Sequence, residues 1–238
     1  MVEVYICNLP AKRDEGALEE LLAHVSPDRR IRLKRYYKMD DAYRSLIGDL
    51  LLRFILEKQF GTVMETLEVE TTAYGKPFLS KHPSVHYNIS HSGDYVVCAI
   101  HDKEVGVDIE NTGPFDLELA KGFLTEEEYG QVWEAEDRLS AFYDMWTLKE
   151  SYIKAVGKGL SIPLRDFTVI KNGTEDIELI DVHSKERITD YAYKQYSVNS
   201  EYSLAVCAQQ VSAAGFNDQP IFVTFEGICE GLEITPEI

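Results

Sequence analysis

Cysteine and positive charge are both scarce in this sequence. The four cysteines among 238 residues stand far apart and form no CxxC or Cys/His pattern, so the sequence suggests neither a disulfide framework nor a zinc site. Lys and Arg number 24 against 41 Asp and Glu, a net charge of −17, which argues against broad binding to nucleic acid or anionic membrane. No uninterrupted apolar run reaches about 18 residues, and the amino terminus lacks a signal-peptide pattern. We expect a cytoplasmic protein that binds neither nucleic acid nor membrane.

Hydrophobic periodicity indicates two similar α+β halves. Helical spacing of apolar residues covers 15–25, 41–60, 115–123, 125–133 and 137–156, and strand-like runs cover 2–9, 85–89, 95–101, 105–109, 167–170, 177–181, 202–208 and 221–225. Ser26-Pro27 predicts a helix start, and Gly61 and Gly157 predict helix ends. We expect a first half at 1–104, a second half at 105–210 and a C-terminal extension at 211–238.

Two carboxylates stand side by side in the strand-like run 105–110. Side chains alternate along a strand, so Asp108 and Glu110 share one face while Val107 and Ile109 share the other. Paired carboxylates without nearby Cys or His suit a hard ion such as Mg²⁺, which completes its shell with phosphates and water. The alternative is a strand with one solvated face.

A third carboxylate lies in the helical run 137–156. Glu150 and Lys154 are one helical turn apart, and Tyr143, Trp146 and Ile153 fall on the same face as Glu150. A carboxylate within an apolar stripe needs a cation or an ion network as its partner. The alternative is an ordinary exposed Glu–Lys pair.

Basic residues gather in one part of this acidic chain. They are Arg29, Arg30, Arg32, Lys34, Arg35, Lys38 and Arg44, against only Asp40 and Asp41 within the same stretch. Such a cluster indicates a site for a phosphorylated small molecule, or else a solvated helix face. Further along, Lys76 and the polar turn with Ser90 and His91 could converge on phosphate oxygens, although self-capping serines would explain that turn equally well.

In this order and spacing, these segments resemble the 4′-phosphopantetheinyl transferases, in particular the larger surfactin-synthetase-activating type. The resemblance is carried by YGKP at 74–77, NISHSG at 88–93, GVDIE at 106–110, WTLKESYIK at 146–154, GKGL at 157–160 and DAYR at 41–44. It covers residues 1 to 210. It implies an α+β fold of two halves with small antiparallel sheets and long helices, related by a pseudo-twofold with the site between them, in a monomer.

The resemblance also implies a reaction and its residues. The phosphopantetheine arm of coenzyme A would be transferred to a serine of an apo carrier protein, with release of adenosine 3′,5′-bisphosphate. Asp108, Glu110 and Glu150 match the family's Mg²⁺ ligands, with Mn²⁺ as a substitute, and Lys154 matches the lysine at the phosphate. Arg44, Lys76, Ser90 and His91 match coenzyme A contacts, and Arg29 and Arg32 stand where similar proteins have lysines near the nucleotide phosphates. The carrier would belong to a peptide synthetase, polyketide synthase or fatty-acid synthase, as in antibiotic biosynthesis.

The chemistry needs neutralised phosphate oxygens, an in-line serine and an acceptor for its proton. Asp108, Glu150 and Lys154 are the candidate catalytic residues, and either Glu150 or a metal-activated water would accept the proton. Two other functions stay open: a Mg²⁺-dependent hydrolase that uses water as the nucleophile, and a non-catalytic binding protein. The complete set of carboxylates and lysine argues against the second.

Overall fold

The computed structural model describes residues 1–61, 67–173, 176–212 and 215–234. The first half contains β1 (Glu3–Asn8), α1 (Glu15–Leu21), η1 (Leu22–His24), α2 (Pro27–Leu33), α3 (Met39–Phe60), β2 (Val69–Thr71), β3 (Pro77–Leu79), β4 (His86–Ser92) and β5 (Tyr95–His101). The second half contains β6 (Val105–Asn111), η2 (Leu117–Gly122), α4 (Glu126–Glu134), α5 (Arg138–Val156), η3 (Gly159–Ser161), η4 (Leu164–Asp166), β7 (Phe167–Lys171), β8 (Ile177–Asp181), β9 (Tyr191–Ser197) and β10 (Tyr202–Gln209). β11 (Ile221–Val223) and α6 (Phe225–Gly231) follow.

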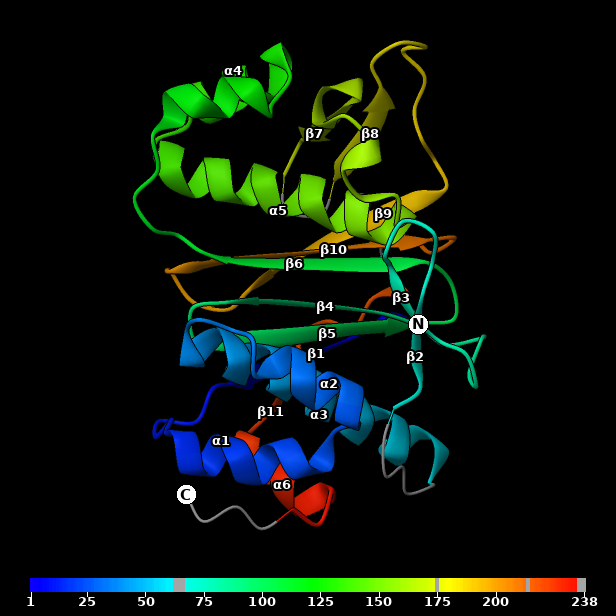
Figure 1. The fold of residues 1–238 in the computed structure, drawn as a ribbon. Helices are drawn as coiled ribbons and strands as arrows, with labels where there is room; N and C mark the ends of the chain where they lie inside the picture. The colour runs from blue at the N-terminus through cyan, green and yellow to red at the C-terminus, as the bar shows by residue number, and fades with distance from the viewer. Residues whose placement is uncertain (62–66, 174–175, 213–214, 235–238) are drawn as a thin grey trace.

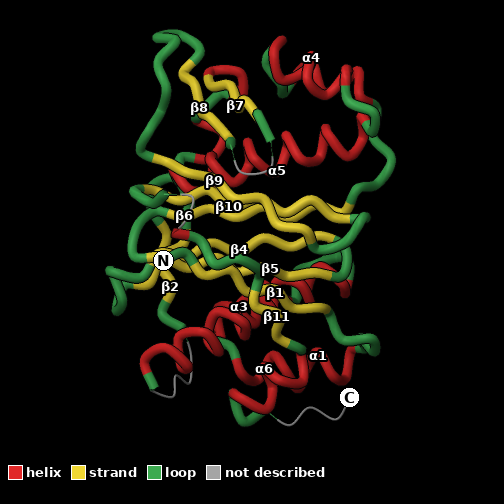
Figure 2. The backbone as a smooth tube through the Cα atoms, turned by 180° about the vertical axis from the view of Figure 1, so that it is seen from behind, coloured by secondary structure: helices red, strands yellow, loops and turns green. Residues whose placement is uncertain are grey.

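Two sheets lie face to face between two layers of helices (Figure 1). One sheet has the strand order β11-β1-β5-β4 and packs on α3, and the other has the order β6-β10-β9 and packs on α5. A third apolar cluster, which includes Val4, Val97, Val107 and Val206, fills the space between the sheets. The view from behind shows the same layers (Figure 2). The predicted α+β class is confirmed.

Local signals explain where the long helices begin and end. Ser26 accepts a hydrogen bond from the Arg29 backbone N–H at 3.3 Å and caps α2, and Asp137 caps α5 through the N–H groups of Leu139 and Ser140. Gly61 and Gly157 end α3 and α5 with φ of 62° and 73°, a left-handed conformation that glycine adopts without strain. The predicted helix over 115–123 is wrong in type, because the chain there forms only the 3₁₀ turn η2.

The C-terminal segment packs against the first half. β11 pairs with β1 in parallel, with Tyr5 opposite Ile221, so this sheet is mixed rather than purely antiparallel. Phe225 and Ile228 of α6 join the apolar cluster around α3. Tyr196 of β9 donates a hydrogen bond to the Asn217 carbonyl at 2.9 Å, so the same segment also contacts the second half. No helix among the described residues is long and apolar enough to cross a membrane.

Helix α5 touches strand β6 at Gly106. A Cβ atom at this position would lie 2.1 Å from the Ser151 carbonyl oxygen and 2.3 Å from the Ala155 nitrogen. Both neighbours are backbone atoms of α5, which cannot turn aside as a side chain can. The absence of a side chain at Gly106 therefore allows helix and strand to approach closely. This approach sets the spacing between the carboxylates of β6, Asp108 and Glu110, and that of Glu150 on α5.

Replacing Gly106 with alanine is expected to destabilise the protein by about 3 kcal/mol, because α5 must move away from β6. Guanidinium unfolding measures the loss. Gly130→Ala is the matched control, since a Cβ there meets nothing within 4 Å and alanine favours the helix. Equal stability of the Gly106→Ala protein and wild type would show that the contact is not a constraint.

Candidate active site

Side chains of β4 satisfy the backbone of β6 where the two sheets meet. β6 is an edge strand of its sheet, and its outward N–H groups need acceptors. The pairs are Val107 N–H to Asn88 Oδ1 at 2.9 Å, Ile109 N–H to Ser90 Oγ at 3.4 Å and Asn111 N–H to Ser92 Oγ at 3.0 Å. This seam of three polar side chains fixes the register of the two halves at the position of Asp108 and Glu110.

Asp108 is the centre of a buried polar cluster. Its Oδ1 accepts hydrogen bonds from Lys154 Nζ at 2.5 Å and from the Ser90 hydroxyl at 3.0 Å. Lys154 Nζ also lies 3.1 Å from Ser90 Oγ, so one residue from each of β4, β6 and α5 meets here. Burial raises the pKa of Asp108, while the charge of Lys154 opposes that rise. The structure thus brings together three residues predicted separately from the sequence.

Glu110 and Glu150 stand beside this cluster. Glu110 Oε2 accepts a hydrogen bond from the Ser92 hydroxyl at 2.9 Å, whereas the Glu150 carboxylate has no hydrogen bond to another described residue. Burial raises the pKa of both carboxyls, and the negative charge of Asp108 raises each of them further. Three carboxylates on β6 and α5 therefore interact electrostatically within the second half, beside the seam with the first.

The donor set fits a hard divalent cation. Asp108 Oδ2 is buried and has no hydrogen-bond partner in the described part of the chain. A buried oxygen without a partner is costly, and a cation would relieve that cost together with the repulsion among the carboxylates. The three carboxylates are not yet close enough to one another to bind a metal ion together, since no group of three His, Cys, Asp or Glu side chains among the described residues has the geometry of a metal site.

Removing one of these charges is expected to stabilise the metal-free protein. Folding raises the pKa of the Glu110 carboxyl, so this group favours the folded state most at acid pH, where it is protonated. That stabilisation is lost as the pH rises through the pKa that the group has in the folded protein. In EDTA near neutral pH, Glu110→Gln should therefore raise the Tm, whereas added Mg²⁺ should raise the Tm of wild type more than that of the variant. Scanning calorimetry measures both. Equal Mg²⁺ responses would remove Glu110 from the ligand set.

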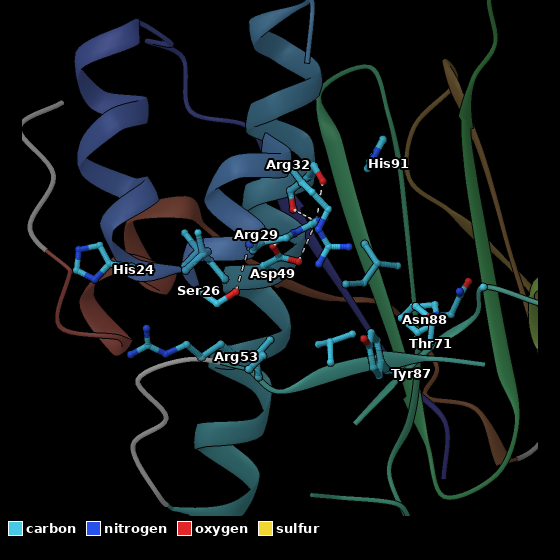
Figure 3. Close-up of a pocket in the computed structure, with 18 residues that line it drawn as sticks. His24, Ser26, Arg29, Arg32, Asp49, Arg53, Thr71, Tyr87, Asn88 and His91 are labelled. Atoms are coloured by element: carbon cyan, nitrogen blue, oxygen red, sulfur yellow. Dashed lines mark hydrogen bonds and ion pairs between the residues drawn. The ribbon is translucent and has the colours of Figure 1, made fainter. Parts of the chain in front are cut away.

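A cavity of about 410 Å³ opens in the first half, between α2, α3, the β2–β3 hairpin and β4 (Figure 3). Arg29 and Arg32 line it on the helical side, and Tyr87, Asn88 and His91 line it on β4. Arg32 is exposed and forms no ion pair with a described residue. The cavity is therefore apolar along part of its wall and positively charged at the helices, which suits a nucleotide or another phosphorylated ligand.

Arg29 is held in place by α3. Its Nε donates to Asp49 Oδ2 at 2.5 Å, and its Nη2 donates to Asp49 Oδ1 at 3.1 Å and to Ser45 Oγ at 2.8 Å. Its Nη1 has no hydrogen-bond partner among the described residues, which leaves two N–H groups for a ligand. The partner charge of Asp49 offsets that of Arg29, so Arg32 is the less neutralised cation of the two.

Arg44 and His91 lie close enough to interact electrostatically, and His91 lines the cavity. Arg44 donates to the Gly93 carbonyl at 2.7 Å and to Asp41 Oδ1 at 2.5 Å. Desolvation lowers the pKa of His91, and the charges of Arg44 and Lys154 act in the same direction. The neutral imidazole is thus favoured here while no anion is bound.

Lys76 points away from the cavity. Its Nζ forms an ion pair with Glu104 and donates to the carbonyls of Ala155 at 2.7 Å and Val105 at 3.3 Å. The residues on either side, Gly75 and Pro77, line the cavity. Lys76 therefore differs from the other predicted phosphate contacts, because its ammonium contacts the β5–β6 turn and the end of α5 rather than the cavity.

Two residues that hold candidate site residues in place are not predicted from the sequence. Ser92 positions Glu110, and strand alternation through Asn88, Ser90 and Ser92 is the signal that could have found it. Asp49 positions Arg29 from a different helix, and no spacing in the sequence links these two residues.

Two family profiles cover most of the chain. The profile described as "4'-phosphopantetheinyl transferase superfamily" matches residues 104–207, and the one described as "4'-phosphopantetheinyl transferase, N-terminal" matches residues 12–103. The 4'-phosphopantetheinyl transferase Sfp of Bacillus subtilis (strain 168) is 39% identical over 203 residues, which cover 84% of this chain and 88% of that protein. The chain belongs to the 4′-phosphopantetheinyl transferase superfamily.

Other members of the superfamily are also similar. The 4'-phosphopantetheinyl transferase gsp of Aneurinibacillus migulanus is 37% identical over 195 residues, which cover 80% of each protein. The solved structure of holo-[acyl-carrier-protein] synthase from Neisseria meningitidis aligns with 45% of this chain and 98% of its own, at 20% identity and a TM-score of 0.39. In this phosphopantetheinyl transferase the two profiles meet between β5 and β6, where the chain passes from one sheet to the other.

Proposed function

We propose that this protein transfers the 4′-phosphopantetheine group of coenzyme A to a serine hydroxyl of an apo carrier protein, with release of adenosine 3′,5′-bisphosphate. One observation supports this above all. The basic cavity of the first half and the carboxylate–lysine cluster of the second half meet at the β4–β6 seam. A coenzyme A molecule needs both, since its nucleotide carries phosphates and its pyrophosphate is the reacting group.

The nucleotide would occupy the cavity, with its phosphates near Arg29 and Arg32. The pyrophosphate would then extend past Ser90, His91 and Arg44 towards Lys154. At Lys76 the backbone, and not the ammonium, would contact coenzyme A, because the residues on either side of it, Gly75 and Pro77, line the cavity. Side chains from α2, α3, β4 and α5 would thus bind one substrate along its length.

The serine oxygen of the carrier would form a bond to the β-phosphorus as the bond to the bridging oxygen breaks. Lys154 would bind the transferred phosphoryl oxygens. The Glu150 carboxylate would accept the serine proton, because it has no hydrogen-bond partner among the described residues and burial raises its pKa. Asp108, Glu110 and Glu150 would hold Mg²⁺, or Mn²⁺ in its place. When bound, the metal supplies charge neutralisation at the pyrophosphate and the leaving phosphate.

Carrier domains of peptide, polyketide or fatty-acid synthases are the proposed partners, with a role in antibiotic biosynthesis, and the enzyme would act as a cytoplasmic monomer. Both the enzyme, with its net charge of −17, and many carriers are acidic. Docking would therefore depend on local basic or apolar surface rather than on long-range attraction.

Intact-protein mass spectrometry tests the function. Several apo carriers are incubated with the protein, coenzyme A and Mg²⁺, with EDTA as the control. A phosphopantetheine-sized gain of mass that EDTA abolishes is expected. Cleavage of coenzyme A without any gain would favour a hydrolase, and neither gain nor cleavage on any carrier would contradict the proposed activity.

A further inference from the structure

The Lys76 ammonium joins three separate parts of the protein. It forms an ion pair with Glu104 in the β5–β6 turn, and it donates to the carbonyl oxygens of Ala155 in α5 and Val105 in β6. A lysine ammonium has three N–H groups, and these three acceptors match that number. The side chain is 11% exposed. No N–H group of Lys76 is left over for a ligand in this arrangement.

The contact with Ala155 lies at the C-terminal end of α5, the helix that carries Glu150 and Lys154. The last four carbonyls of an α-helix lack partners within the helix, and a cation near this end also interacts favourably with the helix dipole. Gly157 N–H satisfies the Ile153 carbonyl, and Lys76 satisfies that of Ala155. Ala155 follows Lys154 directly in the chain. The position of the Lys76 ammonium therefore bears on the last turn of α5, from which Lys154 reaches Asp108.

The backbone of Lys76 belongs to the coenzyme A side of the site. Thr71, Gly75 and Pro77 of the β2–β3 hairpin line the cavity, on the side where Figure 3 shows Thr71. The lysine side chain crosses from this hairpin to α5 beside Gly157, where a Cβ atom would lie 2.5 Å from Lys76 Cδ. The glycine that ends α5 thus also leaves room for the lysine stem.

Glu104 completes the junction. One of its carboxylate oxygens pairs with Lys76, and the other lies 3.3 Å from His86 Nδ1 at the start of β4. The carboxylate therefore connects the lysine to the turn that joins the two halves and to the strand that carries Ser90.

We propose that the Lys76 ammonium is a positioning group, which fixes the C-terminal end of α5 to the wall of the coenzyme A cavity and does not itself bind a phosphate. The inference rests on the proposed function, since it concerns the same reaction. Through this junction, the cavity that binds the nucleotide and the helix that carries Glu150 and Lys154 keep one relative position.

The two possible roles of Lys76 predict opposite results for Glu104→Gln. If the ammonium positions α5, weakening its ion pair should lower kcat and leave the KM for coenzyme A within about threefold of wild type. If instead the ammonium binds a coenzyme A phosphate, loss of the competing carboxylate should free it, and the KM should fall. Lys76→Met separates the roles again, since it keeps the methylene stem beside Gly157 and removes only the charge.

The experiment measures kcat and KM for coenzyme A in Lys76→Met, Glu104→Gln and the control Lys81→Met, whose exposed ammonium pairs with Glu68. Coenzyme A binding is also measured by calorimetry in EDTA without a carrier.

We expect Lys76→Met to lower kcat about tenfold or more, because small displacements of reacting groups are costly. The Kd for coenzyme A should stay within about threefold of wild type. A tenfold weaker Kd of Lys76→Met for coenzyme A would overturn the inference. An unchanged kcat would overturn it as well, even if the variant had a lower Tm, since Lys76 would then contribute to stability alone. Transfer by wild type is measured alongside, so its absence would count against the proposed function, while the calorimetric Kd would still test whether Lys76 binds coenzyme A.

Discussion

Asp108→Asn is expected to lower the transfer rate by at least about a hundredfold while the protein stays folded. Even groups that only support metal ligands are worth about 10–100-fold in affinity or activity, and Asp108 would bind the cation directly. The variant keeps the shape of the side chain and an oxygen for the Ser90 hydroxyl, but it loses the charge that pairs with Lys154 at 2.5 Å. Initial rates of carrier modification at saturating Mg²⁺ measure the effect, and circular dichroism checks the fold.

Asp218→Asn serves as the control for this substitution, because the Asp218 side chain is fully exposed and only approaches Lys194 at 3.9 Å. It should change neither rate nor stability. If Asp108→Asn kept a rate within a few-fold of wild type, or if its Mg²⁺ dependence were unaltered, the metal site proposed at Asp108 would be wrong.

Lys149→Met should cost about 3–5 kcal/mol of folding free energy, because it leaves a buried carboxylate without its cation. Lys149 and Glu128 are both completely buried. Lys149 Nζ donates to the two Glu128 oxygens at 2.6 and 2.8 Å and to the Phe167 carbonyl at 2.9 Å. Glu128 in turn accepts from the backbone N–H groups of Thr125 and Val169, so the pair joins α4, α5 and β7. Denaturant unfolding at neutral pH measures the loss.

A double-mutant cycle isolates the charge pair. Glu128→Gln together with Lys149→Met should be less destabilised than the sum of the single variants, because no unpaired charge stays buried. Glu127→Gln is the control from the same helix turn, where the side chain is exposed, and it should change stability by less than about 0.5 kcal/mol. Additive losses in the cycle would mean that the two charges do not stabilise each other.

The sequence predicts those features of the molecule that depend on neighbouring residues. Ser26 at the start of α2 and Gly61 at the end of α3 are local capping signals, and both are confirmed. Asp108 and Glu110 share a strand face because side chains alternate, and Glu150 and Lys154 are one helical turn apart. These patterns require no knowledge of the rest of the fold, and they place the chemistry on the correct elements.

Contacts between segments that are distant in the sequence cannot be predicted from such local patterns. Lys149 is adjacent to Glu150 in the sequence and has the appearance of a surface charge, yet its partner is Glu128 on another helix. The direction of the Lys76 side chain depends on where α5 ends, which the hairpin sequence does not contain. The sequence does not predict α6 either, because only its packing on α3 explains why a short segment with two glycines is helical.

The pairing of β1 with β11 bears on the order of events during biosynthesis. A ribosome releases a chain from its amino end, and domains commonly fold in that order. Here β1 emerges first, but its outer edge stays open until β11 has been synthesised, and the apolar cluster around α3 lacks Phe225 and Ile228 until then. The second half, whose strands and helices lie between these segments, has emerged by that time. The four-stranded sheet of the half that is made first is therefore completed only after the whole second half has been synthesised.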